Sequence, residues 1–188
     1  DEITNQMHKL ALNHIVNPNF AYKDRPVLFN TWEGSTFSIN EENVLDMGEI
    51  ANNIGIELLV IDDGWFKGRN NDFTSLGDWV ADINKFPKGI GDFADRVRQK
   101  GLTFGIWVEP EMISFESDIF KAHPEYALAR KEALLFERRR QLMIDLSNPE
   151  VVDYLHNCLR NLIIETKPAY IKWDFNRFIT DTNNSLGH

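Results

Sequence analysis

Short apolar runs alternate along this chain with longer stretches in which apolar residues recur every three or four positions. Four of the short runs are rich in β-branched and aromatic side chains, which predicts buried strands. These runs lie at residues 27–32, 56–62, 102–108 and 169–174. The longer stretches have the spacing of amphipathic helices. They lie at residues 38–55, 89–101 and 148–167.

The first predicted helix begins after Ser38 or Asn40, either of which can cap its N-terminus. Its apolar residues recur at helical spacing, so we expect them to form one stripe that faces the core. The members of this stripe are Val44, Met47, Ile50, Ala51 and Ile54.

Strands and helices alternate, with long loops after the strands and short turns after the helices. That order is typical of a parallel α/β fold. The first strand is not followed by a GxGxxG motif and the chain has no P-loop, so the signatures of nucleotide-binding α/β folds are missing. Two segments depart from the alternation. Residues 126–146 predict a β-hairpin, and residues 1–26 predict a leader that comes from a preceding domain.

The composition limits the classes of function. The 188 residues are 43% hydrophobic and 26% charged, an ordinary balance for a globular core. The formal net charge of −9 argues against nucleic-acid and anionic-membrane partners. No apolar run approaches the roughly 20 residues of a membrane span. Cys158 is the only cysteine, which favours a reducing compartment, so we expect a cytoplasmic protein.

Polar and aromatic side chains gather where each predicted strand ends. Because the carboxyl ends of parallel strands meet at one rim, we expect these side chains to converge. The residues at these strand ends are Asn30, Trp32, Glu33, Asp62, Asp63, Gly64, Trp65, Trp107, Glu109, Pro110, Glu111, Met112, Lys172, Asp174, Asn176 and Arg177.

A sugar substrate suits this combination of side chains. Carboxylates accept hydrogen bonds from hydroxyl groups, and indoles pack on the C–H faces of sugars. Cleavage of a glycosidic bond requires one carboxylate as nucleophile or base and another carboxyl group as acid. Asp174 suits the nucleophile, because Lys172 lies two residues away on the same strand face and favours the ionised carboxylate.

Other interpretations of the same residues stay open on local sequence alone. Asp62 and Asp63 could cap a helix or form a turn, and Lys172 and Asp174 could be a structural ion pair. Hard cations also bind carboxylates, although no histidine joins the cluster.

The segment "YIKWDFNR" at residues 170–177 resembles the nucleophile segment of the α-galactosidases of glycoside hydrolase family 36. The likeness extends over residues 25–181 through four further motifs in the family's order. These are "NTWE" (30–33), "IDDGWF" (61–66), "GIWVEPEM" (105–112) and "RRQLMIDLSNPEV" (139–151). The resemblance implies a TIM-type (β/α)8 barrel and a retaining mechanism on terminal α-galactosyl groups, as in melibiose, raffinose and stachyose. It implies no metal or organic cofactor, and a homo-oligomer for the full-length protein.

The resemblance also implies roles for individual residues. Asp174 would be the nucleophile that forms a covalent galactosyl-enzyme. Asp62 and Asp63 would hold the galactose hydroxyls at C4 and C6. Lys172 would hydrogen-bond ring hydroxyls, and Asn176 would bind the C2 hydroxyl.

Three further residues are implied as substrate-binding. Trp32 and Trp107 would form apolar walls, and Arg139 would donate another hydrogen bond. The family's acid/base aspartate lies on a later strand, whereas this sequence stops at His188. Residues 27–188 are therefore expected to hold about the first four βα units of the barrel, with the hairpin at 126–146 as an excursion.

An isolated half barrel is expected to be inactive, because the partner acid would be missing. Two related enzymes share the barrel, and the sequence leaves both open. They are a transglycosylase that makes raffinose-type sugars and an α-N-acetylgalactosaminidase. A non-catalytic carbohydrate-binding half barrel is the alternative from another class.

Overall fold

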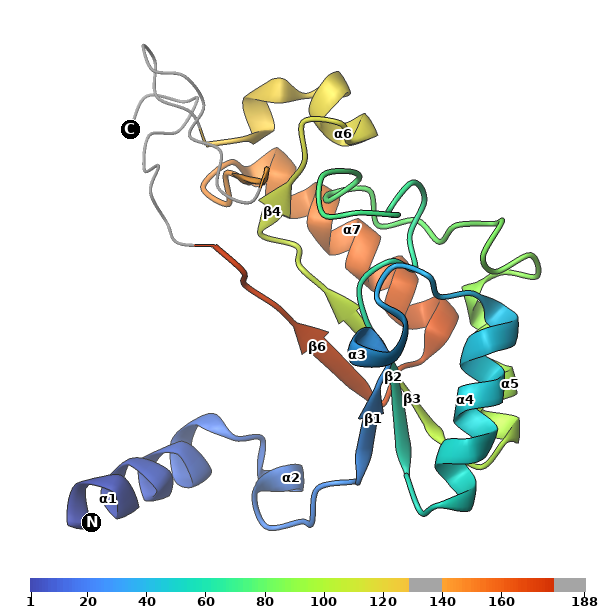
Figure 1. Ribbon diagram of the computed structural model, residues 1–188. Coiled ribbons are helices and arrows are strands. Elements are labelled where there is room, and N and C mark those ends of the chain that lie inside the picture. The colour runs from blue at the N-terminus through green and yellow to red at the C-terminus, as the bar shows by residue number, and fades with distance from the viewer. Residues whose placement is uncertain (129–139, 178–188) are drawn as a thin grey trace.

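A four-stranded parallel sheet forms the centre of the computed structural model, which describes residues 1–128 and 140–177 (Figure 1). Within these residues the order is β1-β2-β3-β6, and every neighbouring pair is parallel. The strands are β1 (Leu28–Asn30), β2 (Leu58–Ile61), β3 (Thr103–Val108) and β6 (Tyr170–Trp173). The predicted parallel α/β fold is confirmed, and neighbours in the sheet follow the order of the chain.

The strand predicted at residues 27–32 ends early. Trp32 already belongs to a short helix, α3 (Trp32–Ser35). The side-chain oxygen of Asn30, the last residue of β1, accepts the backbone N–H of Trp32 at 2.8 Å. This local bond turns the chain out of the sheet and brings the Trp32 ring to the rim.

Three long helices cover one side of the sheet: α4 (Glu41–Asn53), α5 (Ile90–Gln99) and α7 (Pro149–Thr166) (Figure 1). Of the two candidate caps for α4, Asn40 is the one used. Its side chain accepts the Asn43 N–H, and the Asn43 side chain accepts the Asn40 N–H, each at 2.9 Å. This reciprocal pair satisfies two backbone donors at the start of the helix.

The stripe expected on α4 is partly wrong. Ile50 and Ile54 are 65% and 75% exposed, while Leu45 and Gly48 are buried. The buried face of α4 is thus turned toward Gly48 relative to the expected stripe. Gly48 allows this, because even a Cβ at this position would lie only 3.2 Å from Leu59 Cδ1. The helix therefore packs against Leu59 of β2 at this glycine, and the apolar spacing alone does not reveal that contact.

The segment predicted as a hairpin at 126–146 pairs antiparallel at its two ends. The Leu128 N–H donates to the Met143 carbonyl at 2.8 Å, and the Asp145 N–H donates to the Tyr126 carbonyl at 2.7 Å. Residues 129–139, which the prediction places between the two paired ends, lie outside the described residues. One strand of this segment, β5 (Leu142–Met143), also pairs antiparallel with β4 (Met112–Ile113). A two-residue strand such as β4 leaves no periodic signal in the sequence.

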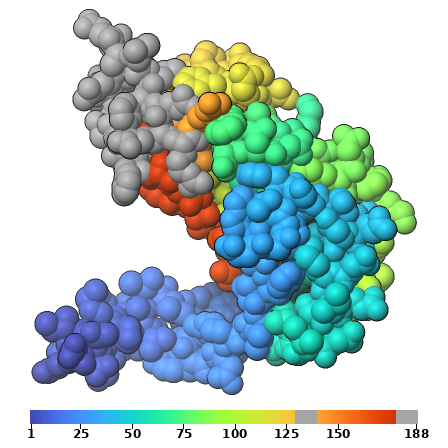
Figure 2. Space-filling view, viewed as in Figure 1, coloured from blue at the N-terminus to red at the C-terminus, as the bar shows by residue number. Residues whose placement is uncertain are grey.

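Further short helices complete the fold. They are α1 (Glu2–Leu10), the π-helical turn η1 (Ala11–Ile15), α2 (Pro18–Ala21), α6 (Asp118–Ala122) and the 3-10 turn η2 (Pro124–Tyr126). The first three extend away from the sheet, and Figure 2 shows a hollow between them and the rest of the molecule. Among residues 1–26 only Ala21 is buried. In the described part of the chain, none of the helices has the length and apolar character that crossing a membrane requires.

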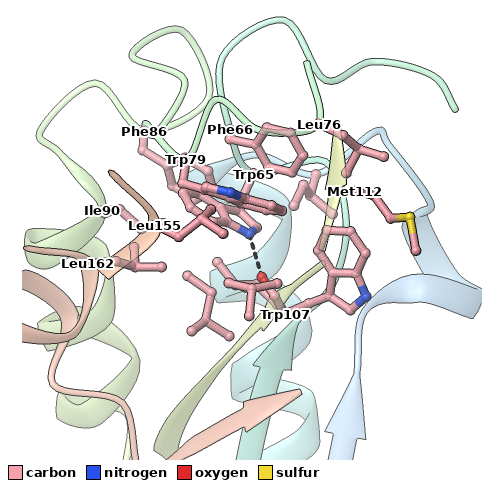
Figure 3. Packing of buried hydrophobic residues seen from close by; sticks show 14 of the residues in the cluster. Trp65, Phe66, Leu76, Trp79, Phe86, Ile90, Trp107, Met112, Leu155 and Leu162 are labelled. Carbon is pink, nitrogen blue, oxygen red and sulfur yellow. Dashed lines mark hydrogen bonds between the residues drawn. The ribbon is translucent and has the colours of Figure 1, made fainter. Parts of the chain in front are cut away.

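Aromatic side chains fill the space above the carboxyl ends of the strands (Figure 3). The indole N–H of Trp65 donates to the backbone carbonyl of Trp107 at 2.9 Å. Phe66 stacks on the Trp107 ring with centroids 6.3 Å apart and planes 5° apart. Trp79 contacts the rings of Trp65, Phe66 and Trp107. This buried cluster packs beside the polar residues at the strand ends and supports their positions.

Candidate active site

A cavity of about 310 Å³ lies at the carboxyl ends of the parallel strands. Seven of the eight site residues predicted from the sequence line it, and the eighth, Arg139, lies outside the described residues. The lining residues are Trp32, Asp62, Asp63, Arg69, Asp72, Trp107, Glu109, Gln141, Lys172, Asp174 and Asn176. Segments that are more than 100 residues apart in sequence therefore meet in one pocket, as the parallel topology predicts.

Asp62 follows β2 directly and is tied to both edges of the sheet. Its Oδ2 accepts the Asn30 amide at 2.6 Å and the Lys172 ammonium at 2.8 Å. Its Oδ1 accepts the Asp63 N–H at 2.8 Å, and its own N–H donates to the Thr31 hydroxyl at 3.0 Å. This carboxylate therefore links β1, β2 and β6 across the rim.

Asp63 is paired with an arginine that the sequence did not point to. Nε and Nη2 of Arg69 donate to the two carboxylate oxygens at 2.9 and 2.8 Å, which is a bidentate fork. Both side chains are buried. Burial raises the pKa of Asp63, and the hydrogen bonds and charge of Arg69 oppose that rise. A lone arginine in the loop after "IDDGW" is the only sequence signal for this partner.

Asp174 lies just beyond β6 and is surrounded by hydrogen-bond donors. Its Oδ2 accepts the Trp107 indole N–H at 2.9 Å, and its Oδ1 accepts the Phe175 N–H at 3.0 Å. Lys172 Nζ lies 3.9 Å from Oδ2. Partial burial acts to raise the pKa of Asp174, but these donors and the Asn176 side chain outweigh it, so the pKa lies below its usual value. Asp174 is therefore held as a carboxylate.

Lys172 bridges the two carboxylates. Partial burial acts to lower its pKa, but the hydrogen bond and charge of Asp62, followed by the charge of Asp174, raise the pKa above its usual value. The ammonium therefore stays charged. It makes one short bond to Asp62 at 2.8 Å and a longer approach to Asp174 at 3.9 Å. The ion-pair interpretation and the substrate-binding interpretation are compatible, because Lys172 also lines the cavity.

The two tryptophans expected to form walls differ in their surroundings. Trp32 is half-buried, and its ring meets Phe37 edge-on with centroids 5.2 Å apart. Trp107 is only 1% exposed, and its indole N–H is directed at Asp174. Trp107 therefore contributes a hydrogen bond to the carboxylate in addition to lining the cavity.

Glu109 follows β3 and is buried beside Asp174 and Asn176. Its Oε1 accepts the Asn176 N–H at 2.8 Å. Burial raises the pKa of Glu109 to about 7, helped by the charges of Asp174 and Asp63 and opposed by hydrogen bonds from Asn176. The sequence placed Glu109 at the rim without a role. In the structure it supports the backbone of the segment that carries Asn176.

Gln141 is a second cavity residue that the sequence did not point to. It is 0% exposed and lines the cavity, yet within the described part of the chain neither atom of its amide group has a hydrogen-bond partner. A buried amide without partners costs free energy, so its presence calls for a ligand or a water molecule. Its position directly after "RR" in the fifth motif is the signal that could have identified it.

Two of the alternative interpretations can be examined against these contacts. Asp62 and Asp63 cap no helix, since the next described helix, α5, begins at Ile90, but Asp62 does accept the N–H of Asp63 in a local turn. Within residues 1–128 and 140–177, no group of three or more histidine, cysteine, aspartate or glutamate side chains is arranged to hold a metal ion. The carboxylates of the rim are instead paired with cations, amides and backbone N–H groups.

Comparison with known proteins identifies close relatives. α-Galactosidase AgaA of Geobacillus stearothermophilus is 39% identical over 178 residues, which cover 95% of this chain and 24% of AgaA. An α-galactosidase of Escherichia coli is 41% identical over 176 residues, which cover 93% of this chain and 25% of that protein. The chain thus spans about a quarter of the length of these relatives.

Solved structures match the fold closely. The crystal structure of the α-galactosidase from Lactobacillus brevis superposes with a TM-score of 0.94 at 42% identity, over 99% of this chain and 25% of that one. A variant of AgaA, described as a GH36 α-galactosidase in complex with raffinose, superposes with a TM-score of 0.92 at 38% identity, over 95% of this chain and 25% of that one. The sequence model of the melibiase family matches residues 1–187. This chain therefore belongs to the melibiase family, and its parallel sheet corresponds to the N-terminal part of the catalytic domain of GH36 α-galactosidases.

Proposed function

We propose that the gene product containing this chain is a retaining α-galactosidase that releases terminal α-linked galactose from melibiose- and raffinose-type sugars. The observation that carries the proposal is the state of Asp174. Its carboxylate is held ionised by the Trp107 indole, the Phe175 N–H and the Lys172 charge, and it faces a polar cavity. The relatives named above are α-galactosidases, and raffinose is bound in one of their structures.

In this proposal Asp174 attacks the anomeric carbon and forms a covalent galactosyl-enzyme, which water then hydrolyses. Asp62 and Asp63 accept hydrogen bonds from the C4 and C6 hydroxyls. Lys172 and Asn176 bind the remaining ring hydroxyls. The donors around Asp174 keep it ionised at neutral pH, but they also reduce its basicity, so expulsion of the leaving group depends on protonation by a separate acid.

We propose that this acid is supplied from outside residues 1–188. Retention requires a second carboxyl group about 5–5.5 Å from the nucleophile. Among the described residues Glu109 is the buried carboxyl group beside Asp174, but its Oε1 is engaged by the Asn176 backbone. The same proposal assigns residues 27–188 to the first four βα units of a (β/α)8 barrel and residues 1–26 to a connecting segment. It follows that the 188-residue polypeptide alone does not turn over p-nitrophenyl α-galactoside.

The nucleophile can be tested in the complete gene product that carries these residues. Asp174→Asn should lower kcat for p-nitrophenyl α-galactoside at least about 10³-fold, because no covalent intermediate can form. Asp153→Asn, an exposed position on α7, is the matched control and should keep wild-type rates.

Azide provides the stereochemical test. In Asp174→Gly, azide can enter the vacated space and displace the leaving group from the face that Asp174 would attack. The product should be β-galactosyl azide. Full activity in Asp174→Asn would refute the nucleophile assignment, and failure of the wild-type protein to cleave any α-galactoside would refute the proposed function.

A further inference from the structure

Lys85 does not line the cavity. Its ammonium group donates hydrogen bonds to three backbone carbonyls of segments that carry or support cavity residues. Its Nζ is 3.1 Å from the carbonyl oxygen of Phe37, 2.7 Å from that of Gly64 and 3.1 Å from that of Arg69. An ammonium group has three N–H donors and no acceptor. Each donor of Lys85 is therefore matched by one carbonyl, and the three carbonyls come from separate turns of the chain.

Each of these three residues adjoins a side chain that lines the cavity. Gly64 directly follows Asp63 in the turn after β2. Arg69 forms the bidentate pair with Asp63. Phe37 supports the ring of Trp32 edge-on, and its own ring lies 5.5 Å from the Arg69 guanidinium carbon. Lys85 thus donates hydrogen bonds to the backbone of residues that adjoin Asp63 or contact Trp32.

The turn at Gly64 packs closely against Phe37. Gly64 has a φ of +106°, and a Cβ there would lie 3.1 Å from Phe37 Cα. The backbones of Gly64 and Phe37 are therefore in near contact, and Lys85 joins the same two residues through their carbonyls. A change in this bridge shifts the turn that carries Asp63 relative to the turn that supports Trp32.

Lys85 is itself well anchored. Its N–H donates to the Asp82 carbonyl at 3.0 Å, and its carbonyl accepts the first N–H of α4, from Glu41, at 2.9 Å. The next residue, Phe86, is fully buried against Phe93 with ring centroids 4.9 Å apart. Burial lowers the pKa of Lys85, while the charges of Asp82 and Asp63 oppose that change. The side chain therefore extends from a fixed base.

We infer that Lys85 is a positioning residue for galactoside binding: it holds Phe37, Gly64 and Arg69 in the arrangement that presents Asp63 to the sugar. The inference rests on the proposed function. It assigns to Lys85 no contact with the substrate. Its effect reaches the sugar through Asp63, which is held both by the turn at Gly64 and by the fork from Arg69.

The kinetic test uses Lys85→Met in the complete gene product, with p-nitrophenyl α-galactoside as substrate. Methionine keeps the length of the stem and removes all three donors. Because Asp63 would bind hydroxyls remote from the reacting bond, KM should rise about tenfold while kcat changes less than about threefold. Lys67→Met is the matched control, because Lys67 lies on the same loop and its side chain forms an exposed ion pair with Asp118. It should leave both constants unchanged.

A double-mutant cycle separates positioning from a general loss of packing. If Lys85 acts through Asp63, adding Lys85→Met to Asp63→Asn should change KM by less than about threefold, because contacting residues are not additive. An equal rise of KM in both backgrounds would overturn the inference, as would a wild-type KM in Lys85→Met.

Hydrogen exchange gives a measurement that does not depend on the reaction. Amides of residues 62–69 should exchange at least about tenfold faster in Lys85→Met than in the wild-type protein or in Lys67→Met. If the wild-type protein cleaves no α-galactoside, the proposed function fails, while the exchange comparison still decides whether Lys85 holds these turns. Unchanged exchange would overturn the inference.

Lys85→Arg covers the case in which the methionine variant does not fold. Arginine keeps the charge, but its donors diverge in a plane and cannot converge from one atom onto three carbonyls. It should raise KM and speed exchange of residues 62–69 in the same direction. Wild-type values for both measurements in Lys85→Arg would refute the positioning role of Lys85.

Discussion

Asp63 and Glu109 show how residues of the same chemistry acquire different properties in one cavity. Both carboxyl groups are buried, and burial raises the pKa of each. Asp63 is matched by the fork of Arg69, which opposes the rise. For Glu109, only hydrogen bonds from Asn176 oppose the rise of the pKa, which therefore reaches about 7. Glu109 therefore changes its protonation state in the neutral range, which links this position to the pH dependence of stability.

The sign of that dependence follows from the two states. The pKa of Glu109 is about 7 in the folded protein against an ordinary value of 4.5. Between these values the folded protein keeps a proton that the unfolded chain has released, so this group's contribution to stability falls as pH rises from about 4.5 to about 7. Glu109→Gln should remove the dependence. We expect Tm of the wild-type protein to fall relative to that of the variant between pH 5 and pH 8, measured by calorimetry. Parallel profiles of the two proteins would contradict the assignment.

Gln141 leads to a second prediction at this scale. Its buried amide lacks partners within the described residues, so Gln141→Met should stabilise the fold by roughly 1 kcal/mol, because a desolvated polar group is removed at nearly constant volume. The same change should weaken hydrolysis of p-nitrophenyl α-galactoside if the amide binds the sugar. Thermal unfolding and KM of the same preparation measure both effects. A loss of stability in the variant would show that the amide is satisfied in solution.

Among the elements, β3 is closely packed at its centre. A Cβ on Gly105 would lie 2.9 Å from Val60 Cγ2 on β2 and 3.1 Å from the carbonyl oxygen of Tyr170 on β6. Gly105 pairs with both residues in register. The glycine therefore sets the spacing between β3 and the strand that carries the nucleophile candidate.

Gly105→Ala should destabilise the protein by about 1–3 kcal/mol, because the added methyl group forces the neighbouring strands apart. Gly34→Ala is the matched control, because a Cβ on Gly34 would lie 3.9 Å from its nearest neighbour, Met47 Sδ. Urea unfolding measures both variants. Equal stability of Gly105→Ala and Gly34→Ala would show that the sheet adapts without cost.

The strands and long helices could be predicted because their signals are local. Apolar runs and helical spacing reflect burial along one element, and Asn40 is a cap that the sequence itself suggests. The buried face of α4 could not be predicted, since it depends on the contact of Gly48 with another element. In the site, the strand-end position placed Asp62, Asp63 and Asp174 correctly around one cavity. The partner of Asp63, Arg69, lies in the middle of a loop, and a loop position carries no such signal.

At the scale of the whole molecule, β1 and β6 are the outer strands of the sheet within the described residues. Several apolar side chains on or next to them are exposed, namely Val27, Leu28, Tyr170, Ile171, Trp173 and Phe175. An outer strand with exposed apolar residues is a template for further pairing. The 188-residue polypeptide should therefore self-associate when it is prepared alone.

Ile171→Lys tests this expectation. A charge on β6 should oppose pairing at that edge, so sedimentation velocity should show less association than in the wild-type polypeptide. Ile83→Lys makes the same substitution at an exposed loop position and should leave association unchanged. A monomeric wild-type polypeptide at micromolar concentration would refute the prediction.

The bond between Asp62 and Lys172 spans 110 residues of chain, and this span has a consequence during synthesis. At about 5–20 residues per second, a ribosome makes Lys172 roughly 5–20 seconds after Asp62. During that interval Asp62 and Asp63 have been made, Arg69 follows within a second or so, and β6 does not yet exist. The nascent chain must keep this rim soluble and unaggregated until its final partner emerges. The order in which the strands leave the ribosome therefore makes the sugar-binding rim one of the last parts of these 188 residues to be completed.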